Sequence, residues 1–245
     1  MADGMTGMPD GVRKATPMYL RIRHAVQERI ESGRYPVGSA IPSENELAAE
    51  FGTTRLTVRN AIDVLVERGL IRRVQGKGAF VSHRWMGSFN SISGFREEVK
   101  AGEGVAGVRQ LSKSKRLAGE WFAHLFGIEP DDVLYTVRRL NSIDGVPISL
   151  EQAYIPLRFF DGIEDIDVSV FSLYETYEMY GRKVVRAQEK LDVAVLSARD
   201  AGLLQVEPSS LALALDSVSY DASGQAIEYA YALNRGDHGG YFYRY

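Results

Sequence analysis

The chain of 245 residues contains no cysteine, which excludes disulfide bonds, thiolate metal sites, iron–sulfur clusters and a cysteine nucleophile. Its four histidines are scattered, without partners at metal-ligand spacing, so we expect no metal and no cofactor. No apolar run approaches the roughly eighteen residues of a membrane span, so we expect no membrane contact. Residues 1–11 lack the basic start and apolar stretch of a secretion signal. We therefore expect a cytoplasmic protein.

The chain also has little net charge, but the charge is unevenly distributed. The formal net charge is −3. Residues 1–84 contain 13 Lys or Arg and 9 Asp or Glu, a balance of +4, whereas residues 85–245 contain 16 and 23, a balance of −7. A basic segment joined to an acidic one suggests a polyanionic partner for the basic part.

Residues 16–82 carry the pattern of three helices and a hairpin. Apolar residues recur at four-residue steps from Met18, which predicts the first helix. Ser43 and Glu46 have the spacing of a capping box and are expected to begin the second helix. Thr54 is the expected N-cap of the third. The core positions of this third helix are Val58, Ala61, Ile62 and Leu65.

Two short apolar segments flank Gln75-Gly76-Lys77-Gly78 and predict the hairpin. Three helices and a hairpin, with a tight turn at Gly52, form the order of a winged helix-turn-helix. We expect residues 1–15 to be a disordered tail and residues 83–90 to link this domain to the next.

Arg55 and Arg59 lie one turn apart on the face of the third helix opposite its core residues. The N-terminal part of such a helix enters the major groove, where an arginine can donate two hydrogen bonds to guanine. A solvated helix face is the alternative interpretation, but the helix order favours double-stranded DNA as the partner. The residues expected to assist at phosphates, base edges or the minor groove are Ser43, Glu44, Asn45, Thr54, Thr57, Gly76 and Lys77.

Residues 91–245 alternate between strand and helix patterns. Asp144-Gly145 between two apolar segments predicts a second hairpin. Further strands are expected at 184–195, 211–220 and 226–233, and helices at 117–126, 172–180 and 197–204. Together they predict an α+β domain whose mostly antiparallel sheet is covered on one side.

Three motifs in the first domain keep a fixed order and spacing: Pro42-Ser43-Glu44-Asn45-Glu46-Leu47-Ala48, Phe51-Gly52-Thr53-Thr54-Arg55-Leu56-Thr57-Val58-Arg59 and Gln75-Gly76-Lys77-Gly78-Ala79-Phe80-Val81. With them, residues 36–81 resemble the DNA-binding domain of GntR-type bacterial transcription regulators. The resemblance implies that Arg55 and Arg59 read bases, and that a homodimer binds an inverted repeat. One departure is Ala79, where the family usually has Thr.

Looser motifs follow in the second domain: Arg139, Asp144-Gly145, Leu150-Glu151, Tyr154-Ile155-Pro156, Ser172-Leu173-Tyr174, Glu228-Tyr229 and Arg235-Gly236-Asp237. Their order resembles the UTRA effector-sensing domain of the HutC branch of that family, which implies a chorismate-lyase-like fold with a pocket for a polar or anionic metabolite. The positions that match the pocket lining of relatives are Arg139, Asn141, Glu151, Ser172, Tyr174 and Glu228.

Two points remain open for this pocket. Relatives that bind phosphates often carry a second Arg where this chain has Asn141, which leaves a carboxylate or polyol ligand open. Glu151 and Glu228 have an alternative role in strand-edge salt bridges with Arg138 or Arg139.

Together these features predict a metabolite-responsive repressor rather than an enzyme. One alternative is an enzyme of lyase type, because the fold implied for the second domain is shared with a lyase, although no paired acid and base can be located. The other is a DNA-binding protein whose second domain only dimerises.

Overall fold

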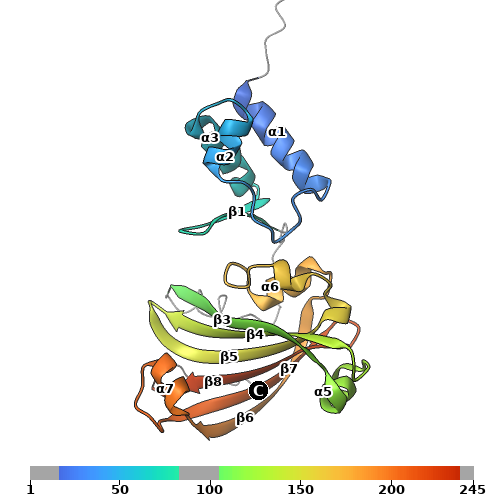
Figure 1. Ribbon diagram of the computed structural model, residues 1–245, viewed down its shortest axis with the longest axis vertical. Coiled ribbons are helices and arrows are strands. Elements are labelled where there is room, and N and C mark those ends of the chain that lie inside the picture. Colours follow the sequence, from blue (N-terminus) through green and yellow to red (C-terminus); the bar gives the residue numbers. More distant parts are fainter. Residues whose placement is uncertain (1–16, 83–104, 238–245) are drawn as a thin grey trace, which may run out of the picture. The chain divides into compact units, whose positions relative to one another are not determined.

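The computed structural model describes residues 17–82 and 105–237. The chain divides into two units between Arg84 and Trp85 (Figure 1). The predicted tail, residues 1–15, and the predicted linker, residues 83–90, lie outside the described residues, as do the two ends of the predicted second domain.

The first unit has the predicted order of elements. They are α1 (Met18–Glu31), α2 (Glu44–Glu50), α3 (Arg55–Glu67), β1 (Ile71–Val74) and β2 (Gly78–Val81), the two strands pairing antiparallel. The predicted capping box is confirmed: the Glu46 N–H donates to the Ser43 hydroxyl, and the Ser43 N–H donates to the Glu46 carboxylate. Thr54 caps α3 by accepting from the Thr57 N–H.

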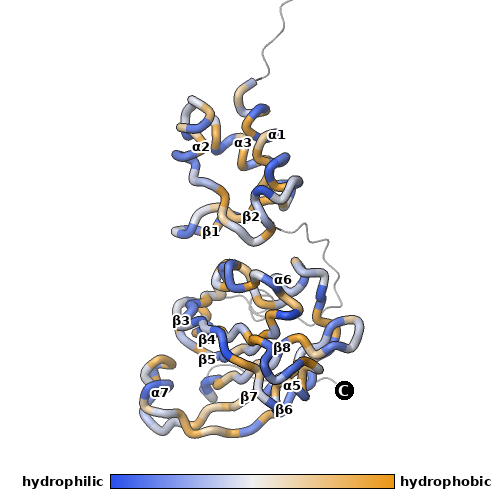
Figure 2. The backbone as a smooth tube through the Cα atoms, turned by 45° about the vertical axis from the view of Figure 1, so that its right-hand side comes forward, coloured by the Kyte–Doolittle hydropathy of each residue, from blue (hydrophilic) through white to orange (hydrophobic). Residues whose placement is uncertain are grey.

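Apolar side chains from all three helices form one core in this unit. Ile22 and Val26 of α1, Leu47 of α2, and Val58 and Leu65 of α3 are fully buried. Each such side chain contributes about 1.5–3 kcal/mol when removed from water. Figure 2 shows hydrophobic and hydrophilic residues alternating along α1 and α3, and a hydrophilic tip on the β1–β2 hairpin. The helix periodicity therefore sets which face of α3 stays in solvent.

The second unit is built on a six-stranded antiparallel sheet in the order β3-β4-β5-β8-β7-β6. The strands are β3 (Ala106–Leu117), β4 (Val133–Ile143), β5 (Val146–Pro156), β6 (Val184–Val195), β7 (Leu211–Asp221) and β8 (Ala226–Arg235). Asp144 (φ 50°) and Gly145 (φ 82°) join β4 to β5, and both have the positive φ that a type I′ hairpin turn requires. The helices are α5 (Gly119–Phe126), α6 (Leu173–Met179) and α7 (Ala198–Leu204), with short 3-10 turns η1 (Leu157–Phe159) and η2 (Ile163–Asp165).

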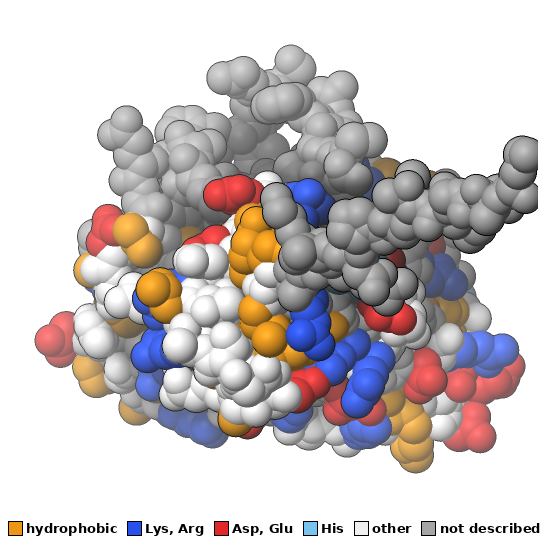
Figure 3. Space-filling model, turned by 90° about the horizontal axis from the view of Figure 1, so that it is seen from above, with side chains coloured by type: hydrophobic (Ala, Val, Ile, Leu, Met, Phe, Trp, Pro, Cys, Tyr) orange, Lys and Arg blue, Asp and Glu red, His pale blue; other side chains and the backbone are white. Residues whose placement is uncertain are grey.

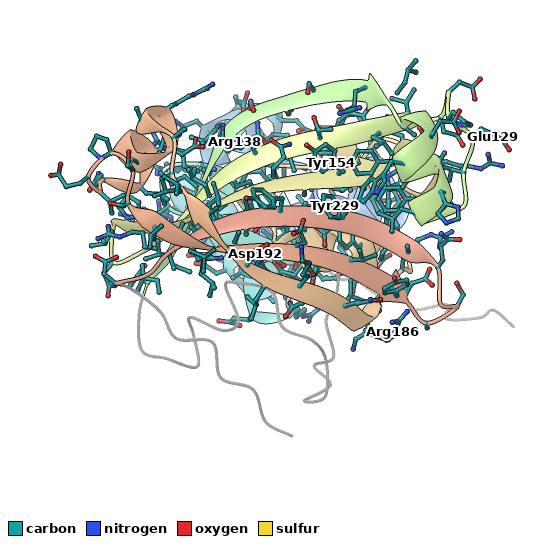
Figure 4. All side chains as sticks on the ribbon, turned by 90° about the horizontal axis from the view of Figure 1, so that it is seen from below. Glu129, Arg138, Tyr154, Arg186, Asp192 and Tyr229 are labelled. Atoms are coloured by element: carbon teal, nitrogen blue, oxygen red, sulfur yellow. The ribbon has the colours of Figure 1, made fainter. Side chains whose placement is uncertain are left out.

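Helices pack on both faces of this sheet, so the expectation of one covered face was wrong. Along β4, Tyr135 and Val137 belong to the same core cluster as Tyr177 of α6. Leu134 and Leu140 belong instead to the clusters of α5 and α7, which lie at opposite ends of the other face (Figures 1 and 4). Successive side chains of a strand point to opposite faces, and here both sets are apolar enough to hold a helix.

Within residues 17–82 and 105–237, no helix is both long and apolar enough to cross a membrane.

Candidate functional sites

The first candidate site is the exposed face at the start of α3. Arg55 and Arg59 keep 61% and 45% of their side-chain surface in solvent. The core residues Val58 and Leu65 of the same helix are fully buried. The two arginines therefore share an accessible face at the helix N-terminus, as predicted from the helical spacing.

Glu44, the first residue of α2, binds both arginines. Its Oε2 accepts from Arg55 Nε at 2.8 Å and from Arg59 Nη2 at 2.9 Å. Arg73 of β1 adds a third contact, from Nη2 to Glu44 Oε1 at 3.3 Å, and also pairs with Asp63. Hydrogen bonds from Arg59 and then Arg55 lower the pKa of Glu44 to about 2, and the Glu44 carboxylate raises the pKa of Arg59. Glu44 is therefore ionised, and its carboxylate connects α2 with α3 and with strand β1 of the hairpin.

The sequence predicts phosphate contact for Glu44 through the free N–H groups at a helix N-terminus, and that contact stays a prediction. The structure adds a role for its carboxylate, which binds guanidinium groups. Arg73 was missed, because a contact between β1 and α2 depends on how the hairpin packs. The Glu44 bond uses only Nε of Arg55, which leaves both terminal nitrogens as a pair of donors for a base edge.

The hydroxyl residues beside the arginines have structural partners. Ser43 and Thr54 accept helix-capping hydrogen bonds, and the Oγ1 atoms of Thr54 and Thr57 are 2.9 Å apart. Ser43 keeps its own hydrogen for a phosphate oxygen, and so does one of the two threonines, because only one of them donates in the Thr54–Thr57 pair. Capping and phosphate contact are therefore compatible. Asn45 is also exposed and lies on α2 next to Glu44.

The hairpin tip presents a bare, exposed turn. Gly76 and Gly78 have φ of 76° and 114°, a region that favours glycine, and Lys77 between them is exposed. On the face of the molecule in Figure 3, basic side chains lie in small groups with acidic side chains beside them. The described surface in this view therefore carries both charges in small groups and is not a uniformly basic patch.

The second candidate site is a polar cluster on the α6 face of the sheet. We call it the buried polar cluster, and its members are Tyr135, Arg139, Asn141, Glu151, Tyr174, Tyr177, Ser219 and Glu228. The strand register places Arg139 of β4 opposite Glu151 of β5, and Ser219 of β7 opposite Glu228 of β8.

Arg139 and Glu151 form an ion pair, and Asn141 Nδ2 donates to Glu151 Oε2 at 3.3 Å. The Arg139 side chain is only 8% exposed and that of Glu151 only 15%. Burial opposes the charge of Arg139, but Glu151 outweighs this and raises the pKa of Arg139. The pair is therefore charged and nearly removed from water.

Glu228 lies at the centre of a second set of hydrogen bonds. It accepts from the Tyr177 hydroxyl at 2.8 Å and from Ser219 Oγ at 3.0 Å, and the Tyr174 hydroxyl lies 3.1 Å from the same Ser219 oxygen. Burial, followed by the nearby Glu151 charge, raises the pKa of Glu228 to about 7. This carboxyl can therefore exist in either protonation state near neutral pH.

Three buried polar atoms of the cluster have no hydrogen-bond partner among the described residues: Arg139 Nε, Asn141 Oδ1 and the Tyr135 hydroxyl. Buried polar groups in folded proteins are nearly always paired, so an orphaned set is a place for water or a ligand. Burial also raises the pKa of Tyr135 to about 12, which keeps this hydroxyl available as a donor.

Hydrogen bonds hold five of the six expected effector residues in two sets: Arg139, Asn141 and Glu151 in one, and Tyr174 and Glu228, through Ser219, in the other. Ser172, the sixth, forms the capping box of α6: its hydroxyl accepts from the Glu175 N–H at 3.1 Å. Arg138 lies on the opposite face of the sheet and pairs with Asp200 of α7 at 2.6 Å (Figure 4). Glu151 therefore pairs with Arg139 and not with Arg138.

Sequence reasoning missed three members of the cluster. Tyr135 lies four residues before Arg139, so the two-residue period of β4 would have placed it on the same face. Tyr177 and Ser219 carry no such signal, because they meet Glu228 only when α6 and β7 are packed in the fold. Within residues 17–82 and 105–237, no three His, Asp or Glu residues are grouped so that they could hold a metal ion.

Comparison with known proteins agrees with this division of the chain. Residues 18–81 match the family described as bacterial regulatory proteins, gntR family, and residues 102–238 match the UTRA domain. The HTH-type transcriptional repressor NagR of Bacillus subtilis (strain 168) is 28% identical over 225 residues, with 90% of this chain and 91% of NagR covered. The HTH-type transcriptional regulator GgaR of Escherichia coli (strain K12) is 22% identical, with 91% and 88% covered.

Among solved structures, PhnF from Mycobacterium smegmatis is similar over both units. The TM-score is 0.55 at 28% identity, with 88% of this chain and 95% of PhnF covered. This similarity confirms the predicted two-domain α+β fold. The UTRA match alone spans more than half of the chain. The protein belongs to the GntR family of bacterial regulatory proteins, in the branch that carries a C-terminal UTRA domain.

Proposed function

We propose that this protein is a transcriptional repressor that holds operator DNA through α3 and releases it when a small polar or anionic metabolite binds the buried polar cluster. The observation that carries the proposal is the exposed pair Arg55 and Arg59 at the start of α3, held side by side by Glu44. NagR, which is similar over nine-tenths of this chain, is a transcriptional repressor, and this similarity supports repression rather than activation of transcription.

On DNA, we assign base reading to the two arginines. Each can give a bidentate contact to guanine worth about 1–3 kcal/mol of discrimination. Ser43, Thr54 and Thr57 would fix the position of the helix through phosphate contacts, and Lys77 would approach the DNA from the hairpin tip. Because these roles act on bacterial DNA, we also propose a cytoplasmic location.

The effector half of the proposal rests on the orphaned atoms of the buried polar cluster. Arg139 Nε and Asn141 Oδ1 are buried without partners among the described residues, which favours a ligand-binding domain over one that serves only for dimerisation. A ligand that supplies their partners stabilises one conformation of the domain. It can change the DNA affinity only by the difference between its affinities for the DNA-bound and the free states.

We further propose a homodimer on an inverted repeat. The strand β6 lies at the edge of the sheet, and Val193 and Val195 on it expose 63% and 65% of their surface. Leu211 on the adjacent β7 exposes 64%. An exposed edge strand with apolar side chains readily pairs with a second chain, and a dimer would present two α3 helices to two half-sites. Size-exclusion chromatography with light scattering measures the molar mass and so tests this proposal. A monomer at micromolar concentration would contradict it.

The direct test of the proposed function is retardation of DNA from upstream of the protein's own gene. We expect one specific protein–DNA complex on an inverted-repeat fragment. This complex should be lost when a metabolite that binds the second unit is added. Absence of any specific complex would contradict DNA regulation, and turnover of the bound metabolite would indicate an enzyme instead.

A further inference from the structure

Among the residues that the structure describes, the buried polar cluster holds two carboxylates but only one cation. Arg139 is paired with Glu151, while Glu228 receives only hydroxyl groups, from Tyr177 and Ser219. Glu228 is 3% exposed, so water does not compensate its charge. The cluster is therefore electrically neutral only when Glu228 is protonated, and it carries one net negative charge otherwise.

The orphaned atoms specify the hydrogen bonds that a ligand must make. Arg139 Nε is a donor in need of an acceptor, and Asn141 Oδ1 is an acceptor in need of a donor. Both side chains contact the same Glu151 carboxylate. A hydroxyl group can accept from the first and donate to the second, whereas a phosphate dianion has no hydrogen to give Asn141.

The charges around the cluster also disfavour a phosphate. A phosphate that bound Arg139 Nε would lie beside the Glu151 carboxylate, which already pairs with the same guanidinium group, and the two negative charges would repel each other. On β3, Lys113 donates to the Glu164 carbonyl oxygen at 2.9 Å and Lys115 pairs with the Glu164 carboxylate. These two lysines lie opposite Val137 and Tyr135 of β4, and both are already engaged by Glu164.

Cations that follow α6 are engaged as well. Arg182 pairs with Asp221 at 2.6 Å, and Lys183 lies 3.9 Å from Glu178. Glu189 of β6 adds negative charge close enough to raise the pKa of Tyr174, together with Glu228 and after the larger effect of burial. An ammonium or a donor-rich neutral group fits this environment, because it would satisfy carboxylates that a phosphate would oppose.

We infer that the effector is a neutral or positively charged molecule rich in hydroxyl or amine groups, such as a polyol or an amino sugar, and not a phosphate ester. The inference rests on the proposed function, in that it takes the buried polar cluster as the effector site. It narrows the polar or anionic ligand of that proposal to the donor-rich class.

The test compares matched probes that differ by one phosphate. Titration calorimetry on the full chain would use glucosamine against glucosamine 6-phosphate, and sorbitol against sorbitol 6-phosphate. We expect the unphosphorylated member of each pair to bind at least tenfold more tightly. Tighter binding of the phosphates, lost in Arg139→Gln, would overturn the inference. So would failure of all four probes to bind at millimolar concentration.

Two variants test whether the preference for unphosphorylated ligands arises in the buried polar cluster. Asn141→Arg adds a cation where the acceptor stood, and should shift the preference at least tenfold toward the phosphates. Glu228→Gln keeps the shape of the side chain and removes its charge, and should lower the advantage of glucosamine over sorbitol. If both variants keep the wild-type preference, the ligand binds elsewhere and the inference fails, whereas the DNA retardation test still decides the proposed regulation separately.

Discussion

The protein contains two clusters in which arginine is held by glutamate, one in each unit. At the start of α3, Glu44 binds Arg55 and Arg59, and both arginines remain about half exposed. In the second unit, Arg139 and Glu151 are paired and nearly buried, with Glu228 beside them. The residue types are the same, but the amount of water around them differs.

That difference in solvation fits different tasks. An exposed ion pair contributes about 0–1 kcal/mol, so Arg55 and Arg59 can leave Glu44 for a base at little cost. Removal of one partner from a buried pair costs several kcal/mol, so the Arg139–Glu151 pair stays formed and holds the unpaired atoms of the cluster in place for a ligand. Exposure therefore suits rapid exchange with DNA, and burial suits a conformational switch governed by a small molecule.

The largest effect is expected from breaking the buried pair. Arg139→Met leaves Glu151 and Glu228 buried without a cation, and should destabilise the second unit by about 3–5 kcal/mol. Trp121 lies on α5 and its ring contacts Tyr229 of β8, so the change in its fluorescence during urea unfolding reports on this unit.

Arg138→Met is the matched control for this measurement. Arg138 is the neighbouring residue, but its pair with Asp200 on the other face is more exposed, with side-chain exposures of 23% and 18%. Its loss should cost clearly less than the loss of Arg139. Equal losses, or a loss below about 1 kcal/mol for Arg139→Met, would contradict the contrast between the clusters.

A somewhat smaller effect is expected from pH. The pKa of Glu228 is raised from 4.5 to about 7 in the folded protein. The folded state then binds more protons than the unfolded state between these values, so this group's contribution to stability falls as pH rises from about 4.5 through 7. The full loss is up to about 3 kcal/mol.

Glu228→Gln should remove this part of the pH dependence. The variant should therefore gain stability relative to wild type as pH rises from 5 to 8, measured by urea unfolding at several pH values. A constant difference between the two proteins across that range would show that Glu228 titrates normally.

On the exposed side, Arg55→Ala and Arg59→Ala should each weaken specific DNA binding by about 1–3 kcal/mol, roughly 5- to 150-fold, with little effect on stability. Fluorescence anisotropy with an operator and a scrambled duplex measures the specificity. Arg68→Ala, at the C-terminal end of the same helix, is the control and should leave the ratio unchanged. If both arginine variants keep the wild-type preference for the operator over the scrambled duplex, Arg55 and Arg59 do not read bases.

The smallest effect on stability is expected from Glu44→Gln, within about 1 kcal/mol. Its effect on DNA binding should have two parts. Release of the arginines should raise affinity for the scrambled duplex a few-fold and steepen its salt dependence. Specificity should fall, because the side chains are no longer held together. Unchanged binding to both duplexes would show that Glu44 has no part in positioning.

Much of the exposed cluster could be predicted from sequence. The helical period separates Arg55 and Arg59 from Val58 and Leu65, and the spacing of Ser43 and Glu46 locates the start of α2. These are local features, set by residues within one or two turns of each other. The contact of Glu44 with both arginines is not local, because it depends on the angle between two helices.

The buried cluster was reached mostly through family resemblance. Alternation along β4 places Arg139 and Asn141 on one face, but it does not say which face meets α6. Tyr177 and Ser219 are brought to Glu228 from elements 51 and 9 residues away in sequence. Apolar residues on both faces of β4 explain why helices cover both sides of the sheet, whereas one covered side was expected.

The measurement that tests the account most directly is DNA affinity as a function of ligand, in wild type and in Asn141→Ala. The variant removes the orphaned acceptor of the buried cluster and leaves α3 intact. We predict equal DNA affinity without ligand, and at least a tenfold loss on adding the tightest-binding probe in the wild type only. Equal release of DNA by both proteins would contradict control through this cluster.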